Sequence, residues 1–234
     1  MSYASYEHAG PLTPVIQLSQ DARTAFLRRT YAHLLGAVLG FVAIEYVLFA
    51  SGLALPIARS MLSVPWLLII GAFMLAGWMA RSVAASAASP AAQYLALGGY
   101  VFAQALIFLP MLVIAALRMP DVLPAAALTT IVAFGALTAL VFVTRQDFSF
   151  LRATLMWGGI VALALMVAGA LFGLDLGVWF SIAMVAFAGA AILYDTSNVL
   201  HHYPANRHVG AALELFASVA LLFWYVLRLF MSRR

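Results

Sequence analysis

The chain has 234 residues, of which 66% are hydrophobic and 9% are charged, whereas about a quarter of the residues of an ordinary soluble domain are charged. This composition excludes a water-soluble globule and indicates a membrane protein. The net charge is +4 and all twelve basic residues are arginine. They stand singly or in pairs between apolar runs, as charges that flank membrane spans do, and do not form the basic face of a nucleic-acid-binding protein.

The N-terminal segment, residues 1–22, contains Pro11 and Pro14 and has no helical apolar face. We expect it to be a flexible cytoplasmic tail. It is not typical of a signal peptide, because no basic stretch precedes a short apolar run with a cleavage site. The rest of the chain, residues 23–234, is expected to form one transmembrane domain.

Long stretches without charge give the architecture, because a membrane-spanning helix needs about 20 apolar residues. The sequence predicts an all-α membrane protein with seven spans. We expect them at about residues 30–50, 60–80, 91–117, 122–144, 153–174, 176–200 and 209–231. Pro90 and the small, weakly polar residues before it are interpreted as the connection between the second and third spans.

The arginines predict the orientation, because cytoplasmic loops carry an excess of basic residues. With a cytoplasmic N-terminus, seven arginines fall on that side: Arg23, Arg28, Arg29, Arg81, Arg145, Arg152 and Arg207. The loops of the other side hold Arg59 and Arg118. The C-terminal pair Arg233 and Arg234 breaks the rule, and an alternative with six spans and an interfacial last segment would restore it.

Ionisable residues within the spans need a partner or a wet cavity, because they are costly in lipid. These residues are His33, Glu45, Asp195 and Glu214. Ser218 lies one helical turn from Glu214 on the same face, so an acidic, hydroxyl-rich cluster is expected between the last two spans. Asp195 is interpreted either as the solvated end of a helix or as part of a proton- or cation-responsive site. The role of Glu45 stays open.

The sequence contains no recognisable catalytic or metal-binding motif. The absence of cysteine excludes disulfides and thiolate nucleophiles. The loop before the last span contains His201, His202 and His208. They are expected to be interfacial and solvated and not to bind a metal, because adjacent histidines diverge and no recognisable ligand spacing surrounds them. Motifs for hydrolases, zinc proteases, nucleotides and dinucleotides are missing. We therefore expect neither a cofactor nor a catalytic site.

Two segments in the last third of the chain carry a resemblance to a known family: Ala191-Ile-Leu-Tyr-Asp-Thr-Ser-Asn-Val-Leu200 and Ala211-Ala-Leu-Glu-Leu-Phe216. They resemble the signature of the Bax inhibitor family of membrane proteins. The segment Phe26–Tyr31 and the loop Thr144–Leu151 are also similar to that family. The resemblance implies a seven-helix bundle with a central last helix. It is closest to the bacterial YccA-like branch, which implies an inner-membrane partner and modulator of the ATP-dependent protease FtsH.

One departure from the family separates two functions. In the calcium-leak branch a second Asp on the last helix pairs with the Asp that Asp195 matches, and Ser218 stands in its place here. An Arg associated with gating falls near Ala80, beside Arg81. The expected pH or ion site therefore comprises Asp195, Glu214, Ser218 and Arg81. An FtsH-binding interaction protein is favoured, and the alternative is a pH-sensitive calcium or proton leak centred on Asp195.

Overall fold

The fold is that of a computed structural model, which describes residues 13–86 and 89–232. Within these ranges the chain forms a short 3-10 helix and eight α-helices and no β-strand. The elements are η2 (Val15–Gln17), α1 (Gln20–Ala50), α2 (Ala54–Leu62), α3 (Trp66–Ser86), α4 (Pro90–Arg118), α5 (Val122–Thr144), α6 (Leu151–Phe172), α7 (Gly177–His201) and α8 (His208–Met231).

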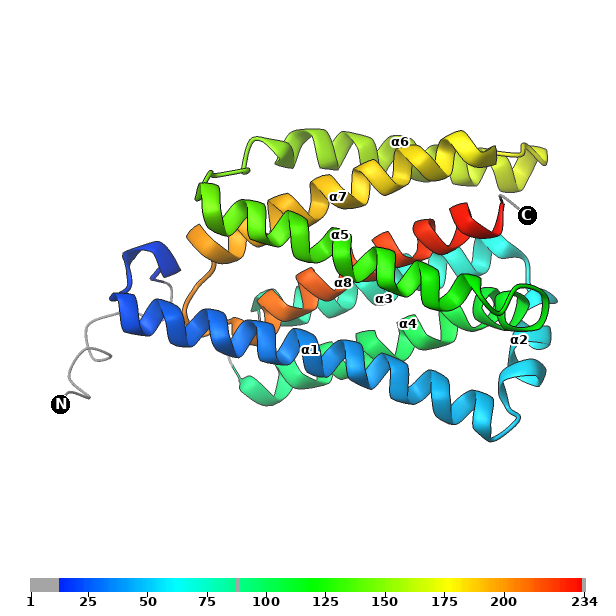
Figure 1. The fold of residues 1–234 in the computed structure, drawn as a ribbon, viewed down its shortest axis with the longest axis horizontal. Helices are drawn as coiled ribbons and strands as arrows, with labels where there is room; N and C mark the ends of the chain where they lie inside the picture. The colour runs from blue at the N-terminus through cyan, green and yellow to red at the C-terminus, as the bar shows by residue number, and fades with distance from the viewer. Residues whose placement is uncertain (1–12, 87–88, 233–234) are drawn as a thin grey trace.

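The long helices lie side by side along the long axis of the molecule, and the start of α1 and the end of α8 lie at opposite ends of the bundle (Figure 1). Six of the described helices are long and apolar enough to cross a membrane: α1, α4, α5, α6, α7 and α8. The all-α membrane fold is thereby confirmed. The predicted count of seven spans is not.

The second expected span, residues 60–80, does not exist as one helix. Its first residues belong to α2, which ends at Leu62, and α3 begins only at Trp66. Pro65 explains the break, because proline has no N–H to donate and disfavours helical geometry in the preceding Val64. The helical run then continues past Arg81 to Ser86, so Arg81 lies within α3 and not in the expected loop.

The first helix starts ten residues earlier than expected. Ser19 caps it, and the Ser19 hydroxyl accepts a hydrogen bond from the backbone N–H of Ala22 at 3.4 Å. Upstream, the N–H of Val15 donates to the carbonyl of Tyr203 at 2.9 Å, and Val15 is fully buried. Residues 13–22 therefore belong to the bundle and not to the predicted tail. The rest of that tail, residues 1–12, lies outside the described residues.

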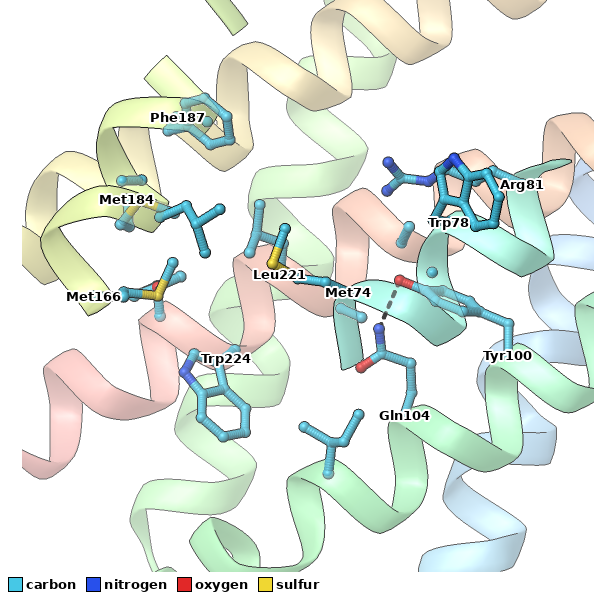
Figure 2. A pocket seen from close by; sticks show the side chains of 18 of the residues that line it. Met74, Trp78, Arg81, Tyr100, Gln104, Met166, Met184, Phe187, Leu221 and Trp224 are labelled. Atoms are coloured by element: carbon cyan, nitrogen blue, oxygen red, sulfur yellow. Dashed lines mark hydrogen bonds between the residues drawn. The ribbon is translucent and has the colours of Figure 1, made fainter. Parts of the chain in front are cut away.

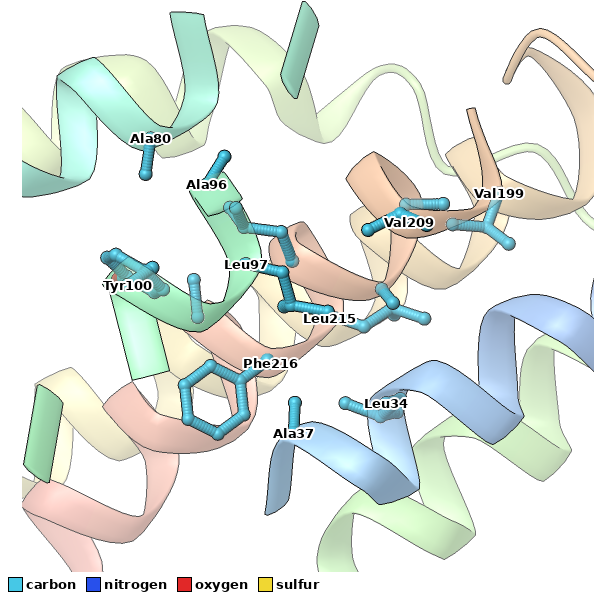
Figure 3. Packing of buried hydrophobic residues seen from close by; sticks show 14 of the residues in the cluster. Leu34, Ala37, Ala80, Ala96, Leu97, Tyr100, Val199, Val209, Leu215 and Phe216 are labelled. Carbon is cyan, nitrogen blue, oxygen red and sulfur yellow. The ribbon is translucent and has the colours of Figure 1, made fainter. Parts of the chain in front are cut away.

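Helix α8 forms the centre of the bundle and packs against α1, α3, α4, α5 and α7. Figure 3 shows Leu215 and Phe216 of α8 between residues of α1 and α4. Phe216 packs edge-on against Tyr100 of α4, with ring centroids 6.1 Å apart. This arrangement agrees with the central last helix that the resemblance implied.

Candidate functional site

A buried polar cluster lies between α7 and α8. The hydroxyl of Ser218 on α8 donates a hydrogen bond to Oδ2 of Asp195 on α7. Ser218 is buried and Asp195 is partly buried. The expected approach of these two helices is therefore present, and the neutral Ser218 hydroxyl faces Asp195.

Glu214 belongs to the same cluster, one turn from Ser218. The phenol of Tyr203, in the loop between α7 and α8, is hydrogen-bonded to the Glu214 carboxylate. Burial raises the pKa of the Tyr203 hydroxyl, and the Glu214 carboxylate raises it further. Tyr203 therefore keeps its proton and remains a donor to Glu214. Its backbone carbonyl meanwhile accepts from Val15, so one residue connects the cluster to the N-terminal segment.

Arg81 of α3 completes the cluster. It interacts electrostatically with both Asp195 and Glu214, and its side chain is hydrogen-bonded to the phenol of Tyr100 on α4. Tyr100 in turn accepts a 2.7 Å hydrogen bond from the amide of Gln104. The four residues proposed from the sequence thus come together from three helices. Their role as a pH or ion site stays a prediction.

The loop between α5 and α6 is fixed to the end of α7. The N–H of Phe148 donates to the hydroxyl of Ser197 at 2.9 Å, and Nε2 of His202 lies 3.3 Å from Oδ2 of Asp147. Partial burial opposes ionisation of Asp147. The N–H and hydroxyl of Ser149, with the nearby His202 and His201, outweigh it and lower the pKa of the Asp147 carboxyl.

The histidines have separate partners. His201 donates from Nδ1 to the Ser197 carbonyl at 2.9 Å. His208 packs edge-on against His33, whose Nε2 lies 2.9 Å from the Tyr94 hydroxyl. Within the described chain, no three His, Asp or Glu side chains gather as metal ligands.

Glu45 lies apart from the cluster, five residues before the end of α1. The side chain is 7% exposed, and neither carboxylate oxygen has a hydrogen-bond partner among the described residues. An unpartnered carboxyl group in an apolar bundle marks a functional candidate, but its surroundings assign it no ligand.

A cavity of about 660 Å³ borders the cluster through Arg81 and Tyr100. Figure 2 shows Arg81, Tyr100 and Gln104 on one side of it, and Met166, Met184 and Phe187 on the other. Sequence reasoning missed Tyr203, Tyr100 and Gln104. The buried amide within an apolar helix was the available signal for Gln104, whereas aromatic residues are too common in membrane helices to single out the two tyrosines.

Residues 23–234 match the sequence profile of the family described as inhibitor of apoptosis-promoting Bax1. The chain belongs to the Bax inhibitor family. An uncharacterised protein of Pseudomonas aeruginosa is 36% identical over 107 residues, which is 44% of this chain and 46% of that protein.

Two Escherichia coli proteins are each 35% identical over 106 residues, 45% of this chain and 48% of theirs. They are named modulator of FtsH protease YccA and inner membrane protein YccA. The matched regions thus span about half the length of these curated relatives. No solved structure matches the chain.

Proposed function

We propose that this chain is a bacterial inner-membrane protein that binds the membrane protease FtsH and modulates it. The observation that carries the proposal is the 35% identity with a relative named modulator of FtsH protease, together with membership of the same family across residues 23–234. Six described helices that are long and apolar enough to cross a membrane support a position in the lipid bilayer, where a membrane protease would be within reach. The proposal includes no enzymatic step.

The structure supports a physical route to modulation. Residues 1–12 precede Val15, which is buried and bonded to the loop between α7 and α8. An unfoldase that engages the N-terminus would pull on this loop and therefore on α8, the most buried candidate span. Extraction would begin by disrupting the centre of the bundle, so the protein would occupy the protease for a long time.

Co-purification tests the binding itself. The full chain and FtsH are co-expressed, extracted in a mild detergent and purified through a tag on the chain, and we expect FtsH in the eluate. A tagged membrane protein of similar size but another family is the control. Recovery of FtsH at the level of that control would contradict the proposal.

Deletion of residues 1–12 tests whether the protease engages the chain through its N-terminal segment. The deletion leaves the Val15 contact in place. We expect the shortened protein to have a longer lifetime in cells that contain FtsH, with its melting temperature unchanged. A lifetime equal to that of the full chain would show that FtsH does not engage the protein through residues 1–12. FtsH binding itself would still be decided by the co-purification experiment.

The buried cluster favours a second candidate, a cation leak centred on Asp195. Asp195 and Glu214 lie near Arg81, which borders the cavity. Because Ser218 donates to Asp195, we expect the native protein to conduct calcium weakly or not at all. Proteoliposomes loaded with a calcium dye compare the native chain, Asp195→Asn and Ser218→Asp between pH 6 and 8. A strong native flux that Asp195→Asn abolishes would make the leak the primary function.

We further propose that the N-terminal end of α1 faces the cytoplasm. That end of the bundle carries Arg23, Arg28 and Arg29 and the α5–α6 loop with Arg145 (Figure 1). The chain has no cysteine, so Ser149→Cys and Asp175→Cys are clean probes of opposite ends. An impermeant thiol reagent should label only Asp175→Cys in intact spheroplasts. The reverse pattern would invert the orientation.

A further inference from the structure

The cavity beside Arg81 has the size and lining of a ligand site. It lies among α3, α4, α6, α7 and α8, and its volume of about 660 Å³ falls within the range of small-molecule pockets, about 300–1,000 Å³. Most of the lining is apolar. Figure 2 shows Met166, Met184, Phe187, Leu221 and Trp224 around the space. Methionine side chains adapt to the shape of a flexible occupant.

Polar groups are concentrated on one side of the cavity. Arg81 is the charged residue among those that line it, its side chain is hydrogen-bonded to the Tyr100 phenol, and Tyr100 and Gln104 lie on the same side of the space (Figure 2). Gln104 is 2% exposed and donates to Tyr100. The cavity is therefore amphipathic, with a cationic, hydrogen-bonding side and an extensive apolar side.

The polar side lies near one end of α3 and the apolar part extends inward. On α3 the lining runs from Ile69 to Ser82, about 20 Å at 1.5 Å per residue. Arg81 lies five residues before the helix ends at Ser86, close to the expected membrane interface. One leaflet contributes about half of the hydrocarbon core of about 30 Å. A chain from one leaflet therefore fits the length of the cavity.

We propose that this cavity binds one acyl chain of an anionic membrane lipid, with the anionic headgroup at Arg81. The guanidinium is suited to phosphate and carboxylate oxygens, and the apolar side accepts the hydrocarbon chain.

A partner helix is the less suitable occupant. A helix with its side chains is about 10–12 Å across and is rigid, whereas a single acyl chain is thinner and adapts to the shape of the cavity.

The test uses the purified full-length protein in a mild detergent and native mass spectrometry. The probes are palmitoyl lysophosphatidylglycerol, palmitoyl lysophosphatidylcholine and palmitate. We expect one bound molecule per protein. The carboxylates of Asp195 and Glu214 offset part of the Arg81 charge, so the expected preference for the anionic over the zwitterionic lysolipid is modest, about fivefold. Binding of palmitate with no lysolipid binding would overturn the membrane-lipid assignment.

A cavity-filling substitution tests the location. Gly159 lines the cavity, and a Cβ there would meet the Phe187 ring at an ordinary 3.7 Å. We expect Gly159→Leu to reduce lysolipid occupancy at least tenfold. Gly135→Leu on α5 is the matched control, because a Cβ at Gly135 meets nothing within 4 Å. If Gly159→Leu lowers the melting temperature, Leu163→Phe, also in the lining, repeats the test.

A charge substitution tests the headgroup contact. Arg81→Gln should abolish the preference for the anionic probe and lower the occupancy of both lysolipids, because both carry a phosphate, whereas Arg118→Gln at the other end of the bundle should change neither. Equal occupancy in the native protein and both cavity-filling variants would overturn the proposal. So would absence of bound lipid combined with loss of FtsH co-purification in Gly159→Leu, because the cavity would then be a protein contact.

Discussion

Helices α6 and α8 are similar in length and apolar character but occupy opposite environments. In the most apolar stretch of α8, 72% of the residues are buried within the protein, against 6% in α6. Both helices contain glycine and alanine at many positions, so small residues do not explain the difference. What distinguishes α8 is Glu214 and Ser218, which find partners on neighbouring elements.

The comparison shows why hydropathy does not identify the central helix of a membrane bundle. Lipid tails are as apolar as leucine, so burial of an apolar face against protein gains little by itself. A carboxyl or hydroxyl group is different, because lipid offers it no hydrogen bond. Polar residues therefore fix α8 inside the bundle, while α6 satisfies its own backbone and faces lipid.

Truncation of a large side chain should give the largest difference in unfolding free energy between the two helices. Leu215 of α8 is fully buried, whereas Leu171 of α6 is 61% exposed to the surroundings of the bundle. We expect Leu215→Ala to lower the free energy of unfolding by about 2–5 kcal/mol, because it leaves a cavity. Leu171→Ala should cost less than about 1 kcal/mol, since lipid fills the space. Equilibrium unfolding in mixed micelles measures both, and equal losses would contradict the central position of α8.

Removal of the buried hydroxyl should have the next largest effect. Ser218→Ala leaves the Asp195 carboxylate without its donor, and we expect a loss of about 1–3 kcal/mol. The exposed Thr154 of α6 provides the matched change, and Thr154→Ala should stay within about 0.5 kcal/mol. A double-mutant cycle with Asp195→Asn isolates the pair. A coupling energy of zero would show that the hydrogen bond does not stabilise α8.

The loop that leads into α6 should depend on pH through Asp147. Because its pKa is lowered in the folded protein, the charged carboxylate stabilises the fold above the unfolded pKa of about 3.9, and this stability is lost as the pH falls through the folded value. Because the Asp147–His202 pair is about half exposed, we expect Asp147→Asn to lower the free energy of unfolding by at most about 1 kcal/mol at pH 7.

The difference between the native protein and Asp147→Asn should disappear as the pH falls below 4, and thermal unfolding at pH 3 to 7 measures it. Asp175 accepts a corresponding backbone bond from Gly177 at 2.9 Å, so Asp175→Asn is the control. A pH-independent loss would assign the Asp147 effect to the turn and not to its charge.

The smallest effect should come from the direct contact between the compared helices. The Tyr225 hydroxyl of α8 donates to the sulfur of Met166 on α6 at 3.6 Å. Sulfur is a weak acceptor, so Tyr225→Phe should cost less than about 0.5 kcal/mol. Tyr46→Phe on the exposed face of α1 is the control. A loss above 1 kcal/mol by thermal unfolding would mean that α6 is held by more than apolar packing.

Helices whose two ends are marked by charged or turn residues were predicted well. The predicted fourth span coincides with α5, Val122–Thr144, because Asp121 and Arg145 delimit an uninterrupted apolar run. Where the boundary residue is apolar or small, the prediction was wrong: Pro65 divides the expected second span, and α1 extends back to Gln20 through a polar stretch. Composition indicates which segments can enter a membrane, whereas the exact ends of the helices depend on individual hydrogen bonds.

The sequence by itself determined an all-α membrane protein, the family, and the candidate residues Asp195, Glu214, Ser218 and Arg81, because polar residues in apolar helices are conspicuous and the family resemblance singled out these positions. Only the tertiary structure decided that these four residues meet, that Tyr203 joins them, that Val15 is anchored beside them, and that a cavity lies next to Arg81. These contacts join segments far apart in the chain. Helical periodicity assigns each residue to a face of its own helix, but only the packing of all the helices sets which faces meet.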